Sequence, residues 1–246
     1  MLPSSPPQQS TRRQLLRAGI TAAIGSWAAF EVLGAGQASA AALRQPVAPS
    51  SSRVSLVGDS LTIGTMPFQA DAFANAGWTQ SAVDAYVSRG VRTKIRADRY
   101  TGLTAVDAIR EQSGDTQAWV IALGTNDAVI YSPEKQTQVI GLMMDHIGPG
   151  HRVLWVNVFL PTREKLQTTW NTSLVRAAAG RNDMFVYDWA AFAAANPRFL
   201  AHDNIHYDHD GYRYRAQAVS LASRNLMPAP GDLPRWQLTW EEKILS

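Results

Sequence analysis

The sequence predicts an α/β fold, a parallel sheet with helices on both faces, because short apolar runs alternate with amphipathic stretches. The runs have the length of strands and are rich in β-branched or aromatic residues. They are almost continuously apolar, as expected for strands that are buried on both faces. The five predicted strands are Arg53–Val57, Ala82–Val87, Trp119–Leu123, Val153–Val158 and Met184–Tyr187. No internal repeat is visible in the sequence, so we expect one domain over residues 53–246.

Helical patterns separate these runs, at about 102–112, 164–180 and 211–225. A further helix is predicted after Ser132, which is a good N-cap residue and is followed by Pro133 and the acidic Glu134. Its face toward the core is expected to carry Val139, Leu142, Met143 and Ile147. In the C-terminal tail, Trp236 and Trp240 are expected to pack on the core.

Residues 1–40 have the pattern of an export signal. The pair Arg12-Arg13 follows Ser-Thr and precedes two leucines, which resembles the twin-arginine motif, and a weakly apolar stretch then leads to Ala-Ser-Ala ending at Ala40. An uncleaved anchor is the alternative. However, the stretch 18–30 spans only about 20 Å as a helix, against roughly 30 Å of bilayer core. We therefore predict cleavage after Ala40, export by the twin-arginine machinery to the periplasm, cell wall or exterior, and a linker over 41–52.

Charge and cysteine content exclude several classes of function. The formal net charge is +3, but three arginines and one glutamate give residues 1–40 a charge of +2, so only +1 remains for residues 41–246. No dense Lys/Arg stripe occurs there, which argues against a nucleic-acid partner. The chain has no cysteine, which excludes disulfides, thiolate metal ligands and a cysteine nucleophile. We expect a monomer that needs no cofactor.

Polar residues follow the predicted strands, at the edge of the sheet where α/β proteins bind ligands. Ser60 follows the first strand, Asn126 follows the third, and Asp203 and His206 lie near the C-terminus. Each has an ordinary structural explanation, such as a helix cap or a solvated loop. Together they form a complete catalytic set: a hydroxyl nucleophile, a base, and a carboxylate close enough to orient that base. The Ser60 N–H and the Asn126 side-chain amide would then stabilise the oxyanion.

A metal site is the alternative for the histidine cluster, because His202, His206 and His209 lie close to Asp203 and Asp208. A loop that leads into a helix explains these residues better, with Asp208 as the N-cap and the next residue at the first helical position. We predict no metal ligand in this cluster and no catalytic role for His202 or His209.

Three blocks resemble, in order and spacing, those of the SGNH or GDSL hydrolases: Gly58–Leu61 (GDSL), Gly124–Asp127 (GxND) and Asp203–His206 (DxxH). The resemblance covers about residues 53–222. It implies a three-layer α/β/α sandwich with five parallel strands, catalysis by Ser60, His206 and Asp203, Asn126 in the oxyanion hole, and a structural role for Asp59. The substrate would be a carboxylic ester of a small molecule, glycan or lipid. The GxSxG motif, which forms the nucleophile elbow of the α/β-hydrolases, is absent.

The second block of the family departs from its pattern here. The family uses the N–H of a glycine as an oxyanion donor. Alignment of the stretch Val83–Gly90 places Ser88 at that position, and a small shift places Gly90 there instead. A backbone N–H serves in either case, but glycine is favoured if φ is positive.

Three functions remain open from the sequence. The first is an exported esterase, and the second is an O-acyltransferase on a cell-envelope glycan or lipid. The second is suggested by the pattern of Val83, Asp84, Ala85 and Arg89, which resembles SGNH domains that act on cell-wall glycans. The third is a binding protein that has lost catalysis, which the intact catalytic set argues against. Met66, Phe68 and Trp189 are candidates for lining a substrate pocket, although core packing explains them as well.

Overall fold

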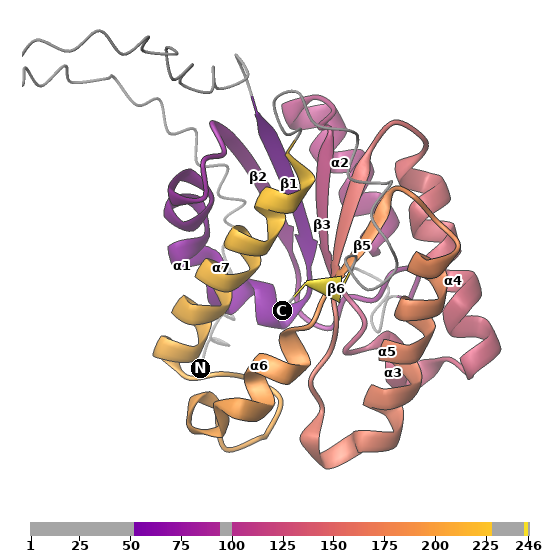
Figure 1. Ribbon diagram of the computed structural model, residues 1–246, viewed down its shortest axis with the longest axis vertical. Helices are drawn as coiled ribbons and strands as arrows, with labels where there is room; N and C mark the ends of the chain where they lie inside the picture. The colour runs from indigo at the N-terminus through magenta and orange to yellow at the C-terminus, as the bar shows by residue number, and fades with distance from the viewer. Residues whose placement is uncertain (1–51, 94–99, 228–243, 246) are drawn as a thin grey trace, which may run out of the picture. The chain divides into compact units, whose positions relative to one another are not determined.

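The computed structural model describes residues 52–93, 100–227 and 244–245, and within them a parallel sheet in the order β2-β1-β3-β4-β5-β6 (Figure 1). The strands are β1 (Arg53–Gly58), β2 (Gln80–Ala85), β3 (Ala118–Ala122), β4 (Arg152–Val156), β5 (Met184–Tyr187) and β6 (Ile244–Leu245). The five predicted strands and the predicted α/β class are confirmed. β6 was not predicted; it is a two-residue strand that pairs with Val186 and Tyr187. Trp236 and Trp240 lie outside the described residues, as do the predicted signal and most of the linker.

Seven α-helices and three short 3-10 helices connect the described strands. The α-helices are α1 (Ser60–Asn75), α2 (Gly102–Ser113), α3 (Asp127–Ile130), α4 (Pro133–Ile147), α5 (Glu164–Ala179), α6 (Trp189–Ala195) and α7 (His209–Ser223). The 3-10 helices are η1 (Pro161–Arg163), η2 (Pro197–Phe199) and η3 (Arg224–Leu226). Helices α2, α4 and α5 bury their apolar residues on one face of the sheet, and α1, α6 and α7 on the other (Figure 1). The architecture therefore has three layers.

Each central strand is apolar on both sides, which explains why its sequence does not alternate. In β4, for example, Val153 and Trp155 belong to the core under α2, α4 and α5. Leu154 and Val156 belong to the core under α1, α6 and α7. The period-2 geometry of a strand therefore divides one continuous apolar run between two cores.

One predicted core residue of α4 is wrong. Leu142 is exposed, while Ile140 and Met144 are buried together with Met143 and Ile147. The i, i+3, i+4, i+7 spacing from Ile140 places these residues on one helical face, and Leu142 lies beyond its edge. No helix among residues 52–93, 100–227 and 244–245 has both the length and the apolarity needed to cross a membrane.

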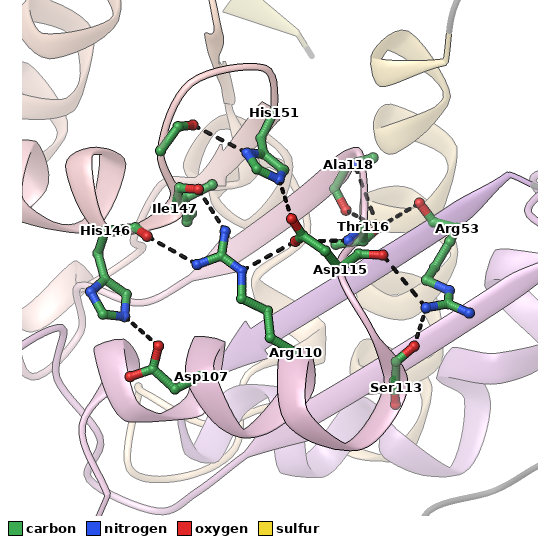
Figure 2. A network of polar contacts seen from close by, with 11 residues as sticks. Arg53, Asp107, Arg110, Ser113, Asp115, Thr116, Ala118, His146, Ile147 and His151 are labelled. Carbon is green, nitrogen blue, oxygen red and sulfur yellow. Dashed lines mark hydrogen bonds and ion pairs between the residues drawn. The ribbon is translucent and has the colours of Figure 1, made fainter.

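A polar network holds α2 and α4 together near the start of β3 (Figure 2). Arg110 of α2 donates to the carbonyl oxygens of His146 and Ile147, at the end of α4, over 3.0 and 2.6 Å. Asp115 accepts from Arg110 at 3.1 Å and contacts His151 Nε2 at 2.9 Å. The guanidinium group therefore satisfies carbonyl groups that an α-helix leaves without a partner at its C-terminus.

Candidate active site

Ser60 is the first residue of α1, and only Asp59 separates it from the end of β1. Asp59 is the N-cap: it is buried, and its Oδ1 accepts a hydrogen bond from the Leu61 N–H at 3.0 Å. Gly58 is required because a Cβ there would lie 1.9 Å from Thr62 Oγ1. The three residues before Leu61 thus have separate roles: close packing, capping, and presentation of a hydroxyl at the carboxyl end of the sheet.

Asp203 organises the loop that carries His206. Its Oδ1 accepts hydrogen bonds from the N–H groups of Ile205 and His206, at 3.0 and 2.9 Å. The following turn leads into α7, where Asp208 accepts from the Gly211 N–H at 2.7 Å, so the predicted N-cap is confirmed. A single carboxylate therefore both folds this loop and faces the imidazole ring.

The structure brings Ser60, His206 and Asp203 together in one relay. His206 Nε2 lies 3.0 Å from Ser60 Oγ, and His206 Nδ1 lies 2.6 Å from Asp203 Oδ2. The His206 imidazole, with the N–H groups of His206 and Ile205, holds the pKa of Asp203 well below its usual range. An ionised Asp203 favours the tautomer in which Nδ1 carries the proton, and in that tautomer Nε2 can accept a hydrogen bond from the Ser60 hydroxyl.

This relay lies on an open surface. The side chains of His206 and Asp203 are 38% and 50% exposed. Trp189, one of the candidate pocket residues, is buried in the core, and Met66 and Phe68 are half-buried. The described side chains therefore present the hydroxyl at the surface of the domain.

Asn126 is placed beside the second-block loop. Its Nδ2 donates to the carbonyl oxygen of Arg89 at 2.9 Å, which orients the side-chain amide. An amide nitrogen carries two protons, and the structure gives the second one no acceptor among the described residues. That N–H is a candidate donor to an oxyanion.

The second-block loop distinguishes Ser88 from Gly90. Ser88 has a φ of 57°, in the left-handed region that favours glycine. The Gly90 N–H is already used, since it donates to the Thr93 carbonyl oxygen at 3.1 Å. The backbone of this loop therefore favours Ser88 over Gly90 as the residue at the glycine position of the family.

Arg89 belongs to the second-block pattern in the sequence, but no individual role was predicted for it. It is fully buried and pairs with Asp84 Oδ1 at 2.8 Å, and it also donates to the carbonyl oxygens of Asp84 and Gly58, at 2.7 and 3.3 Å. Because its own carbonyl oxygen accepts from Asn126, Arg89 connects the end of β1, just before Ser60, to the candidate oxyanion amide. The only signal in the sequence was its place six residues after Val83.

Asp127 is the last residue of the Gly124–Asp127 block, and no individual role was predicted for it either. It is fully buried, and its Oδ1 accepts a hydrogen bond from the Val91 N–H at 2.9 Å. Its Oδ2 is buried without a partner among the described residues. Burial, opposed by the Val91 N–H and reinforced by the nearby Asp59 carboxylate, raises the pKa of Asp127 to about 7. Asn126 and Asp127 therefore hold the second-block loop on either side of Gly90.

The remaining histidines of the cluster do not join the relay. The His209 ring packs edge-on against Phe68, with ring centroids 5.1 Å apart, and the His202 side chain is exposed. Within the described ranges, no three His, Asp or Glu side chains are grouped so that they could hold a metal ion.

No family model matches the sequence, and no curated protein matches it. Solved structures do match. The catalytic domain of peptidoglycan O-acetyltransferase A from Streptococcus pneumoniae is 17% identical, with a TM-score of 0.51 over 69% of this chain and 89% of that one. An aryl esterase from M. smegmatis is 16% identical, with a TM-score of 0.56 over 72% and 100%. A member of the lipolytic G-D-S-L family from Veillonella parvula is 12% identical, with a TM-score of 0.54 over 69% and 96%.

The fold is that of the SGNH hydrolases. The predicted similarity to this group is thus confirmed at the level of the fold. The Gly58–Leu61 block lies at the end of β1, the Gly124–Asp127 block follows β3, and the Asp203–His206 block precedes α7. In this fold the three blocks meet at one edge of the sheet.

Proposed function

We propose that the chain is a serine esterase that cleaves carboxylic esters through an acyl-enzyme. The observation that carries the proposal is the relay from Ser60 Oγ to His206 Nε2, at 3.0 Å, and from His206 Nδ1 to Asp203, at 2.6 Å. A serine hydroxyl becomes a useful nucleophile only beside such a base. The similarity in fold to solved esterases is consistent with the proposal.

The reaction proceeds in two halves. Ser60 Oγ attacks the ester carbonyl carbon as its proton passes to His206 Nε2, and Asp203 stabilises the imidazolium that forms. The carbonyl oxygen gains the negative charge and accepts hydrogen bonds from the N–H groups of Ser60 and Ser88 and from Asn126 Nδ2. Collapse of the intermediate expels the alcohol, which takes the proton from His206. Water, deprotonated by His206, then attacks the acyl-enzyme and releases the carboxylic acid and Ser60.

Hydrolysis of p-nitrophenyl acetate by the purified protein tests this proposal. We expect turnover that falls by at least about 10³-fold in Ser60→Ala and in His206→Ala. His202→Ala and His209→Ala are matched controls, since both residues lie outside the relay, and they should retain turnover. Undiminished turnover in Ser60→Ala would refute the proposal.

Acyl transfer is a second candidate that uses the same residues. Two observations favour it: the ion pair between the buried Arg89 and the half-buried Asp84, both residues of the second-block pattern, and the similarity in fold to an O-acetyltransferase. In this case a sugar or lipid hydroxyl, rather than water, attacks the acyl-enzyme. Formation of acylated glycan on addition of a cell-wall glycan acceptor, with little release of free acid, would favour transfer over hydrolysis.

We also propose that the protein is exported through its N-terminal twin-arginine motif. The paired Arg12-Arg13 and the small residues up to Ala40 support this. N-terminal sequencing of the exported protein should give a chain that begins at Ala41. Replacement of both arginines by lysine should retain the protein inside the cell. An intact Met1 on exported protein would contradict cleavage.

A further inference from the structure

Three large apolar side chains near the candidate site are exposed. Ile63 of α1 is 36% exposed, and Val129 and Ile130 of α3 are 50% and 45% exposed. Each therefore leaves apolar surface in water, which costs free energy in proportion to its area. Contiguous exposed apolar surface is a mark of a binding site.

Helix geometry places these side chains beside the reacting groups. Ile63 follows Ser60 by three residues in α1, and Val129 and Ile130 follow Asn126 by three and four residues. Asn126 itself has helical dihedral angles, with φ −85° and ψ −36°, so the helical spacing extends back to it. Residues three or four apart share a helix face and are neighbours. One apolar group therefore adjoins the nucleophile, and two adjoin the candidate oxyanion amide.

The outward side of α1 continues this apolar surface away from Ser60. Beyond Ile63, Pro67 is exposed, and Met66 and Phe68 are half-buried. The first charged residue of the helix is Asp71. A surface helix normally carries charged residues on its outward face. The first three turns of α1 instead provide a strip without charge that starts at the nucleophile.

The loop that carries His206 is polar. His202, Asp203 and Asn204 are exposed. The leaving alcohol must receive its proton from His206 Nε2, so the alcohol lies over this loop. The oxyanion points toward Asn126, which leaves the acyl chain the space next to α1 and α3.

We infer that Ile63, Val129 and Ile130 form an acyl-binding rim, and that the preferred substrates are amphiphilic esters with an apolar acyl chain on a polar alcohol. This inference rests on the proposed function and narrows its substrate class. Each methylene group that the rim removes from water should raise kcat/KM by about two- to fourfold. Charged or strongly polar acyl groups should react poorly.

The test is a series of p-nitrophenyl esters from acetate through butyrate to hexanoate. We expect kcat/KM of the native sequence to rise at least about tenfold from acetate to hexanoate. The double variant Ile63→Ser, Val129→Ser should lose most of this hexanoate-to-acetate preference, chiefly through KM. Leu221→Ser is the matched control, because Leu221 is 59% exposed at the far end of α7, and it should keep the preference. A flat or falling series, or an unchanged preference in the double variant, would overturn the inference.

Alkyl fluorophosphonates separate this inference from the proposed function. Their reaction with Ser60 requires the activated nucleophile but no turnover. Faster labelling by an octyl than by an ethyl reagent, with the difference lost in the double variant, supports the rim. Equal rates on Ser60 overturn the rim and leave the nucleophile standing. Absence of labelling overturns both.

Discussion

Asp127→Asn should change the pH dependence of folding stability, because the buried carboxyl of Asp127 has a pKa near 7. Burial raises this pKa from 3.8 to about 7, so the folded protein binds a proton at Asp127 that the unfolded chain has already lost. Stability conferred by the neutral carboxyl is complete below about pH 4 and is lost as the pH rises through about 7. The difference between the pKa values of the unfolded and folded states corresponds to about 4 kcal/mol in total. Roughly 2–3 kcal/mol of this loss falls between pH 5 and pH 8.

The asparagine variant cannot ionise at this position, so it escapes that loss. Its Oδ1 can still accept from the Val91 N–H, while its new NH₂ group replaces an oxygen that has no partner among the described residues. That unpaired donor costs about 1–3 kcal/mol at every pH. Relative to the native sequence, the variant should therefore gain about 2–3 kcal/mol of stability on going from pH 5 to pH 8.

Urea unfolding at pH 5, 6, 7 and 8 measures this difference from the midpoints, provided that the m-values agree. Asp71→Asn, at an exposed position of α1, controls for the loss of one negative charge. A stability difference between Asp127→Asn and the native sequence that stays constant from pH 5 to pH 8, or that moves against the variant, would show that Asp127 does not titrate near pH 7 in the folded protein.

Three further predictions concern the oxyanion groups and the network between α2 and α4. Asn126→Ala should lower kcat for p-nitrophenyl acetate by roughly 10²–10³ with little change in KM, and a loss confined to KM would contradict the oxyanion role. Ser88→Gly keeps the backbone N–H and relieves a left-handed residue, so thermal unfolding should show equal or greater stability, by up to about 1 kcal/mol, and activity should persist. A tenfold loss of activity would argue against this. Burial raises the pKa of Asp115, but its hydrogen bonds to His151, Thr116 and Arg110 outweigh burial, and the net pKa lies below the usual value. The ionised carboxylate therefore stabilises the folded protein above about pH 4, and this stabilisation is lost as the pH falls. Asp115→Ala should therefore cost about 1 kcal/mol in urea unfolding at pH 7 and less at pH 3, and an equal cost at both would contradict it.

The fold was predictable because the residues of each strand indicate, without reference to distant parts of the chain, that the strand is buried. A run such as Val153–Val158 is apolar on both sides only if both faces of the sheet are covered. β6 was not predictable, since two residues carry no periodicity and their pairing with β5 depends on distant parts of the chain. Leu142 was assigned to the core from spacing alone, whereas burial of Ile140 and Met144 sets the true face of α4.

Some residues of the candidate site were also predictable from the sequence, and others were not. Ser60 and Asn126 were identifiable because they follow strands at the ligand-binding edge of the sheet, and Asp203 and His206 because a serine nucleophile requires a base and a carboxylate that orients it. The choice between Ser88 and Gly90 depended on a backbone φ angle, which spacing does not determine.

No individual role was predicted for Arg89 or Asp127, because their significance arises from burial and from contacts with residues 31 and 36 positions away. The sequence blocks include both residues but do not show that their side chains are buried.

Mass spectrometry after reaction with an ethyl fluorophosphonate tests most directly the claim that Ser60 is an activated nucleophile. We expect one adduct per chain, located on the peptide that contains Ser60. We also expect no adduct in Ser60→Ala and a labelling rate that falls by at least about 10³-fold in His206→Ala. An adduct on another residue, or labelling of Ser60 at the same rate without His206, would show that His206 does not activate Ser60 as a nucleophile.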